Sequence, residues 1–183
     1  MSKNRVEKFE NKKRLFELQP YETLVKIGLK RDQIFCDIGA GTGIFTFAAS
    51  GITEEKIYAV DISDEMIEVL SKRKNEGKVD QLEIIKVSDA NLPIESSSVG
   101  LILLATVFHE LEGPEKMLKE IKRIKKDTGK LAIIEFHKKK TPTGPPINQR
   151  ISKEALVETC LKNGLKEFER FNLGKNFYVI LFK

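Results

Sequence analysis

Short apolar runs alternate along the chain with segments in which apolar residues recur at helical spacing. The runs are rich in β-branched and aromatic residues and are short enough to predict buried strands. They occupy residues 33–38, 56–62, 82–87, 99–107, 130–136, 168–173 and 176–182. Strands that alternate with helices in this way favour an α/β fold, in which helices cover both faces of a mostly parallel sheet.

Four helices are expected between these strands, because capping residues and glycines mark their ends. They cover residues 42–51, 63–77, 114–124 and 152–164. In the last of them, Ala155, Leu156 and Leu161 are expected to face inward. The two final strands are joined by only Gly174 and Lys175, and this short connection predicts an antiparallel hairpin at one edge of the sheet.

Residues 1–29 form a charged, helical segment ahead of the first strand, and residues 30–183 carry the alternating pattern. Apolar residues at Leu15, Phe16, Leu24, Val25 and Ile27 are expected to pack this segment onto the sheet. We interpret it as a flank or lid of the functional site.

Composition narrows the class of protein. A chain of 183 residues, with 40% hydrophobic and 32% charged residues, fits one globular domain. With only two cysteines, the chain is not a disulfide-stabilised scaffold. Its first residues are charged, unlike a signal peptide, and its apolar runs are too short to span a bilayer. These features predict a cytoplasmic protein. The net charge of +5 is interpreted mainly as helix ends and solvated surface.

The chemistry is expected in the run FCDIGAGTGI, residues 35–44, between the first strand and the first helix. Its three glycines permit a tight turn and the close approach of a ligand. The spacing differs from the G-x-G-x-x-G of pyrophosphate sites, since Ile44 stands where the third glycine would be. Asp37 precedes this loop, and a carboxylate there repels a pyrophosphate but attracts an ammonium group.

Two further carboxylates follow the next two strands. Asp61 ends the second strand, 18 residues beyond Gly43, and suits the two hydroxyls of a ribose. Asp89 follows the third strand and suits an exocyclic amine. Together with Asp37, these residues match the ammonium, ribose and adenine groups of S-adenosylmethionine.

With these motifs the chain resembles the class I S-adenosylmethionine-dependent methyltransferases, from about Leu18 to its last residue. Residues 92–94, 108–111 and 113–114 resemble the small-molecule, type 11-like branch of the class. The resemblance implies a doubly wound, Rossmann-like three-layer sandwich with strand order 3-2-1-4-5-7-6 and an antiparallel last strand. Gly100 departs from the family pattern, where relatives often carry Asp near the start of the fourth strand.

The resemblance also implies the residues that contact the cofactor, and S-adenosylhomocysteine as the product. Three glycines and Ala40 would approach the methionine part near Asp37, and the other residues would hold the ribose, the adenine and the methionine chain. The implied cofactor residues are Asp37, Gly39, Ala40, Gly41, Gly43, Asp61, Ile62, Met66, Asp89, Ala90 and Ala105. No metal is expected.

Candidate catalytic residues follow the fourth and fifth strands, whose ends face the expected crevice. His109 and Glu110 are the candidates for proton transfer, with Glu135 a weaker one. His137 and Arg150 are candidates for contact with the substrate. Methyl transfer depends mainly on the alignment of the nucleophile with the methyl group, so a general base is not obligatory.

The leading hypothesis is methyl transfer to a small molecule by a monomer or homodimer. The alternatives are an RNA methyltransferase, which the positive charge keeps open, and a non-catalytic S-adenosylmethionine-binding protein. The glycine spacing argues against a nicotinamide dehydrogenase. Residues 105–109 lack the Asn/Asp-Pro-Pro-aromatic motif of DNA amino-group methylases, and two cysteines are too few for an arsenite methylase.

Overall fold

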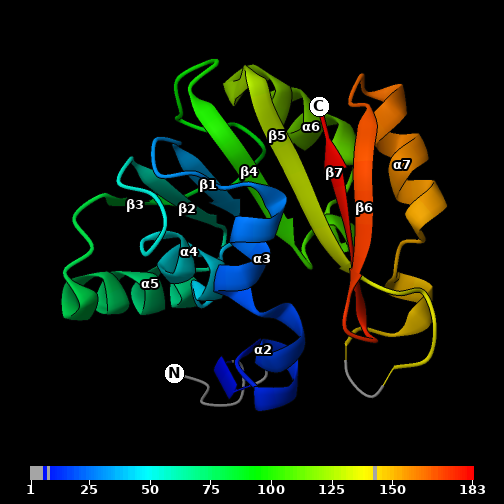
Figure 1. The fold of residues 1–183 in the computed structure, drawn as a ribbon, viewed down its shortest axis with the longest axis horizontal. Helices are drawn as coiled ribbons and strands as arrows, with labels where there is room; N and C mark the ends of the chain where they lie inside the picture. Colours follow the sequence, from blue (N-terminus) through cyan, green and yellow to red (C-terminus); the bar gives the residue numbers. More distant parts are fainter. Residues whose placement is uncertain (1–5, 8, 142–143) are drawn as a thin grey trace.

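A seven-stranded sheet lies between two layers of helices (Figure 1) in a computed structural model, which describes residues 6–7, 9–141 and 144–183. The strand order is β3-β2-β1-β4-β5-β7-β6, and β7 is antiparallel to both of its neighbours. The strands are β1 (Phe35–Ile38), β2 (Ile57–Asp61), β3 (Leu82–Lys86), β4 (Val99–Ala105), β5 (Lys125–Phe136), β6 (Glu167–Leu173) and β7 (Phe177–Phe182). The order and the antiparallel last strand confirm the expected fold class.

The helices divide between the two faces of the sheet. The first group packs on one face and consists of α3 (Pro20–Ile27), α4 (Ile44–Ala49) and α5 (Asp64–Gly77), preceded by the short α2 (Lys12–Leu18). The second group packs on the opposite face and consists of α6 (Pro114–Ile124) and α7 (Lys153–Lys162). Two separate apolar cores result, one on each side of the sheet.

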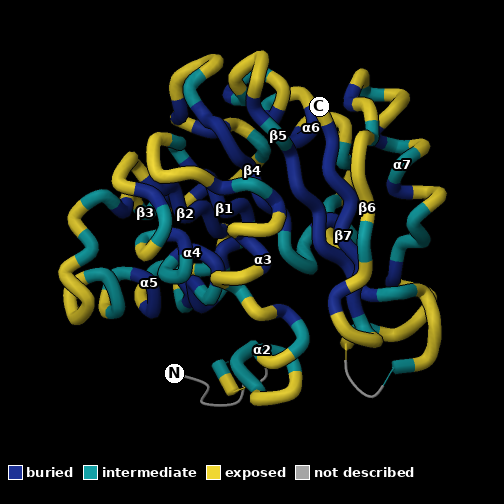
Figure 2. The backbone as a smooth tube through the Cα atoms, in the orientation of Figure 1, coloured by how far each residue is buried: buried dark blue, intermediate teal, exposed yellow. Residues whose placement is uncertain are grey.

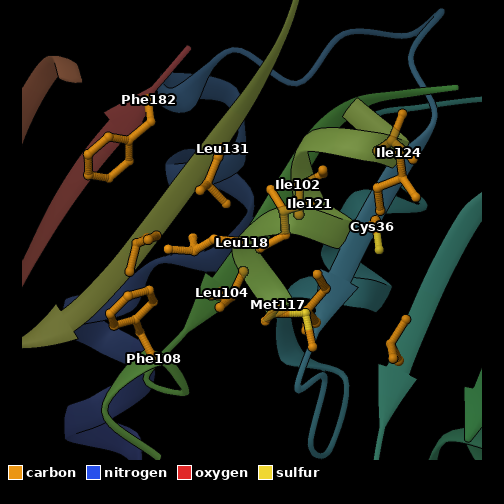
Figure 3. Packing of buried hydrophobic residues seen from close by; sticks show 14 of the residues in the cluster. Cys36, Ile102, Leu104, Phe108, Met117, Leu118, Ile121, Ile124, Leu131 and Phe182 are labelled. Atoms are coloured by element: carbon orange, nitrogen blue, oxygen red, sulfur yellow. The ribbon is translucent and has the colours of Figure 1, made fainter. Parts of the chain in front are cut away.

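The central strands are buried on both faces, as their continuous apolar sequences require. Every residue of β1, β2 and β7 is buried, whereas exposed residues recur along the edge strands β3 and β6 (Figure 2). Figure 3 shows one core, where Leu118 of α6 lies over Ile102, Leu104 and Leu131 of β4 and β5. Each such side chain contributes about 1.5–3 kcal/mol through burial.

Several local expectations differ from the structure. Strand β5 begins at Lys125, five residues before the expected start, because Lys125 pairs with Val99 ahead of an irregularity in the β4–β5 register. In α7 the expected inward positions Ala155 and Leu161 are wrong, since both are exposed. Cys160 is buried beside Leu156 instead.

The N-terminal helices pack through fewer residues than expected. Leu24 and Ile27 are buried against the sheet, but Phe16 and Val25 are exposed. Helix α2 is held by Leu18, which is fully buried, and by Glu17, whose carboxylate accepts hydrogen bonds from the backbone and side-chain nitrogens of Asn176 at 3.1 and 2.8 Å. This contact links the first described helices to the turn between β6 and β7.

The winding of the chain reverses at β1, which pairs with β2 on one side and β4 on the other. Connections from the carboxyl ends of these strands therefore leave in opposite directions and open a crevice at that edge of the sheet. The glycine loop, the end of β2 and the end of β4 all meet there.

The connection between β3 and β4 is fastened to α6 by Arg123. Its guanidinium donates to the carbonyls of Leu92 and Ile94 at 2.7 and 2.8 Å and pairs with Glu120 at 2.7 Å. Glu120 in turn accepts a hydrogen bond from the backbone nitrogen of Leu92 at 3.2 Å. These contacts fix a connection that also carries Asp89, one of the residues expected at the site.

Replacing Arg123 by Met should lower the free energy of unfolding by about 1–3 kcal/mol, because two carbonyls lose their donor. Urea denaturation measures this loss. Lys119→Met, which removes an exposed charge from the same helix, should change stability by less than about 0.5 kcal/mol. Equal losses in the two variants would contradict the assigned role of Arg123.

Candidate active site

A cavity of about 500 Å³ lies at the carboxyl ends of β1, β2 and β4. Its volume falls within the ~300–1,000 Å³ usual for small-molecule sites. The glycine loop and three strand-end aspartates form one part of its wall, while residues 105–107 and 110–113 form another. Phe9 and Arg14, from the N-terminal segment, complete the lining.

Two glycines of the loop have different structural roles. Gly41 lines the cavity at φ +55°, and a Cβ placed there would meet only the carbonyl of Gly39 at 4.0 Å, so any side chain would extend into open space. Gly43 adopts φ +83° at the N-cap of α4, where a Cβ would lie 2.6–2.7 Å from Phe47 and Leu70. Gly41 therefore leaves room for a ligand, whereas Gly43 allows the helix to pack.

Asp61 connects the end of β2 to the glycine loop. One carboxylate oxygen accepts a hydrogen bond from the backbone nitrogen of Gly41 at 2.8 Å, and the other accepts one from Ser63 at 2.9 Å. The side chain lines the cavity while these two bonds fix its orientation. Each oxygen retains a further lone pair with which it can accept a hydrogen bond from a ligand.

Asp37 lies deeper, at 2% exposure, and accepts a hydrogen bond from the Thr46 hydroxyl at 2.6 Å. Burial raises the pKa of Asp37 to about 7, assisted by the nearby charge of Asp61 and opposed by the Thr46 hydrogen bond. The site thus contains a carboxyl group whose charged form is destabilised until a cation or a donor reaches it.

The structure brings ten of the eleven expected cofactor residues to the cavity, all except Gly43. Met66 is buried on α5, whereas Ile62 is 72% exposed at the cavity edge. Asp89 accepts a hydrogen bond from the backbone nitrogen of Asn91 at 2.8 Å, which fixes its carboxylate beside Ala90.

His109 is not among the residues that line the cavity. Its Nδ1 lies 2.8 and 2.9 Å from the two oxygens of Glu135, which is fully buried. Burial lowers the pKa of His109, but the hydrogen bond and charge of Glu135, together with Glu110, outweigh it and raise the pKa above its ordinary value. Glu110 does line the cavity, with Oε1 3.7 Å from His109 Nε2.

The two expected substrate residues do not line the cavity either. The Arg150 guanidinium donates to the backbone carbonyls of Pro145, His137 and Lys139 at 2.7–3.0 Å, so it holds the connection that follows β5. The ring of His137 lies against Tyr178, with centroids 5.5 Å apart.

Sequence reasoning missed Phe9, Arg14 and Thr106 as lining residues. The helical pattern of residues 1–29 indicated a flank near the site, but it carried no signal for which side chains point inward. Thr106 follows β4 without a motif of its own, and its position is visible only in the structure. There it adopts φ +61°, a left-handed conformation that is rare for a β-branched residue.

Comparisons with known proteins agree with this geometry. The family model described as a methyltransferase domain matches residues 36–133, more than half of the chain. An uncharacterized methyltransferase-like protein of Schizosaccharomyces pombe is 38% identical over 101 residues, 55% of this chain and 37% of that protein. A ubiquinone/menaquinone biosynthesis C-methyltransferase of Cronobacter sakazakii is 29% identical over 125 residues, 67% of this chain and 49% of that protein. The matched part is thus less than half of either relative.

One solved structure is similar over almost the whole chain. The crystal structure of an S-adenosylmethionine-dependent methyltransferase from Aquifex aeolicus has a TM-score of 0.92 and 28% identity, covering 97% of this chain and 95% of that one. The fold and cavity define a class I methyltransferase architecture. The chain belongs to the methyltransferase domain family, and its cofactor is S-adenosylmethionine.

The cavity residues fit that cofactor. Gly41 leaves space that a Cβ would fill, and carboxylates stand at the ends of β1 and β2 with lone pairs for an ammonium group and a ribose. Across the described residues, no group of three or more His, Cys, Asp or Glu side chains is arranged to hold a metal ion. Among the residues that the structure describes, no helix is long and apolar enough to cross a membrane.

Replacing Asp37 by Asn should stabilise the protein more at pH 8 than at pH 5. The pKa of about 7 in the folded protein exceeds the ordinary value of 3.8. The contribution of this group to the free energy of unfolding is therefore fully present below about pH 4 and is lost as the pH rises through 7. Asn has no charged form and avoids that loss. Urea denaturation at both pH values measures the difference.

Thr46→Val is the matched variant, and its expected effect on stability is opposite to that of Asp37→Asn. It removes the hydroxyl that donates to the carboxylate, and so should destabilise the protein more at pH 8 than at pH 5. If the effect of Asp37→Asn on stability were the same at both pH values, the raised pKa would be contradicted.

Proposed function

We propose that the chain transfers a methyl group from S-adenosylmethionine to a small-molecule acceptor. The observation that carries this proposal is the continuity of one cavity, from the glycine loop and strand-end aspartates to the apolar side chains of Phe9, Val107 and Leu111. Its moderate volume and partly apolar wall suit a small acceptor. The similarity to a C-methyltransferase of quinone biosynthesis supports the same class of acceptor.

In this proposal the cofactor residues keep the roles that the family resemblance implies, and their positions in the cavity lining support those roles. Gly39, Ala40 and Gly41 lie along the methionine part, with Asp37 near its amine and Ala105 beside its chain. Other residues of the cavity wall contact the ribose and the adenine. These are Asp61 for the ribose, Ile62 and Met66 for the faces of the adenine, and Asp89 with Ala90 for its edge.

Residues 6–7 and 9–29 act in this proposal as the roof of the site. Arg73 of α5 pairs with Glu10 at 2.5 Å and also donates to the carbonyl of Thr42 at 2.7 Å, which fastens the roof to the glycine loop. Phe9 and Arg14 then cover the cavity. The roof excludes water from the reacting groups and confines the acceptor.

The bound cofactor supplies an electrophilic methyl group on its sulfonium. The protein's own contribution is alignment, because the end of β4 and the roof define where the acceptor atom lies. Glu110 is the carboxylate placed to take a proton from an acceptor that must lose one. His109 acts through it, as a positioning residue fixed by Glu135.

Cofactor binding is the first test. Calorimetry should show that the chain binds S-adenosylmethionine and S-adenosylhomocysteine, and a metabolite screen that reads S-adenosylhomocysteine formation should reveal a small acceptor. Turnover only with RNA would replace the proposal by the RNA alternative. Binding without turnover of any acceptor would favour the non-catalytic alternative, since fold alone does not determine activity.

Gly41→Val should abolish cofactor binding, because its side chain would extend into the cavity. Asp61→Ala should weaken binding by about 1–3 kcal/mol, the cost of losing charge-assisted hydrogen bonds. Gly51→Val, at a glycine remote from the cavity whose Cβ would meet only ordinary contacts of 3.5 Å or more, is the control and should bind normally. Unchanged affinity in the first two variants would refute the placement of the site.

A further inference from the structure

Arg14 brings a guanidinium group to the cavity from the roof. Its Nη2 donates a hydrogen bond to Thr106 Oγ1 at 2.9 Å, directly after the end of β4. The rings of Phe136 and Phe177 lie next to each other on one side of the group, each with its centroid 5.7 Å from Cζ. Arg14 is therefore held at the part of the cavity where the acceptor would lie.

This guanidinium is incompletely paired. Its Nε is buried and has no hydrogen-bond partner among the residues that the structure describes. Both oxygens of Glu135, the carboxylate whose charge acts on Arg14, lie within hydrogen-bond distance of His109. Burial lowers the pKa of Arg14 to about 10 against the effect of Glu135, so the group remains a cation at neutral pH.

Among the buried groups around Arg14, guanidinium groups outnumber carboxylates. Arg150 also lies within the field of Glu135, and its Cζ is 5.2 Å from the centroid of the Phe136 ring that contacts Arg14. Two guanidinium groups therefore face one buried carboxylate, which His109 shares. Three other charged residues of the lining are solvent-exposed, namely Glu110, Glu112 and Lys116.

Backbone strain marks the same place. Thr106 adopts φ +61°, a strained backbone conformation for a β-branched residue. The strained backbone places the Thr106 hydroxyl where it accepts the hydrogen bond from Arg14. Strain of this kind concentrates at ligand sites, where the surrounding structure maintains it.

We propose that Arg14 determines acceptor specificity by binding the anionic group of a small acid, such as a carboxylate on an aromatic or alkyl body. The guanidinium matches a carboxylate in charge and geometry, and Phe9, Val107 and Leu111 provide apolar contacts for the body. This inference rests on the proposed function, because it names the class of acceptor for the same cavity.

The test compares acids with their neutral amides. Benzoate and benzamide, and phenylacetate and phenylacetamide, are titrated into the protein with saturating S-adenosylhomocysteine, and binding is followed by ligand-observed NMR. The acids should bind about tenfold or more tightly than the amides, as expected for a charge-assisted hydrogen bond. Acids that bind no tighter than their amides overturn the inference without reference to any variant.

Variants locate the preference. Arg14→Met should reduce the ratio of acid to amide affinity to within about twofold of one, while Arg14→Lys should retain part of it. Lys13→Met removes a charge from the adjacent, exposed position and should leave the ratio unchanged. A preference that persists in Arg14→Met contradicts the assignment.

Cofactor affinity separates this inference from the proposed function. Arg14→Met should bind S-adenosylhomocysteine within about threefold of the natural chain, which also shows that the variant folds. If the natural chain binds no S-adenosylhomocysteine, the proposed function fails. The same titrations without S-adenosylhomocysteine then still decide whether Arg14 selects anions.

Discussion

The parallel pairing of β1 between β2 and β4 is the constraint on which the rest of the structure depends. All four residues of β1 are buried, so the strand is held by both neighbours and by apolar side chains above and below the sheet. Because β1 lies between β2 and β4, the connections that leave the carboxyl ends of these strands diverge. The glycine loop, Asp61 and the end of β4 meet at that point. A change that displaced β1 would therefore remove both the core and the cavity.

The charge distribution divides the cavity into two parts. Asp37, Asp61 and Asp89 line it near the ends of β1, β2 and β3, and Arg14 lines it from the roof, bonded to Thr106 after β4. The aspartates match a cofactor with an ammonium group, whereas Arg14 is a cation that interacts with the charge of Glu135. This separation provides different electrostatic environments for two ligands in one continuous space.

Local signals predicted the helices, the strands and the α/β class, because periodicity and capping residues are visible within short segments. The strand order came from the family resemblance. Most of the residues expected to contact the cofactor do line the cavity, since Asp37, Asp61 and Asp89 each lie at or just after the end of a recognisable strand. The acceptor side depends on contacts between distant segments, which no local pattern encodes. Arg14 forms a hydrogen bond with Thr106, 92 residues later in the chain. His109 lies within hydrogen-bond distance of Glu135, 26 residues later.

The hydrogen bonds from Asn176 to Glu17 have a consequence for the order of assembly. They join positions separated by 159 residues, so helix α2, which carries Arg14, acquires this support only after the C-terminal hairpin has formed. During synthesis from the N-terminus, the first helices emerge long before Asn176 exists. The partners of the roof at Arg73 and Thr106 are synthesised earlier, so the support from Asn176 is the last of these contacts to become available.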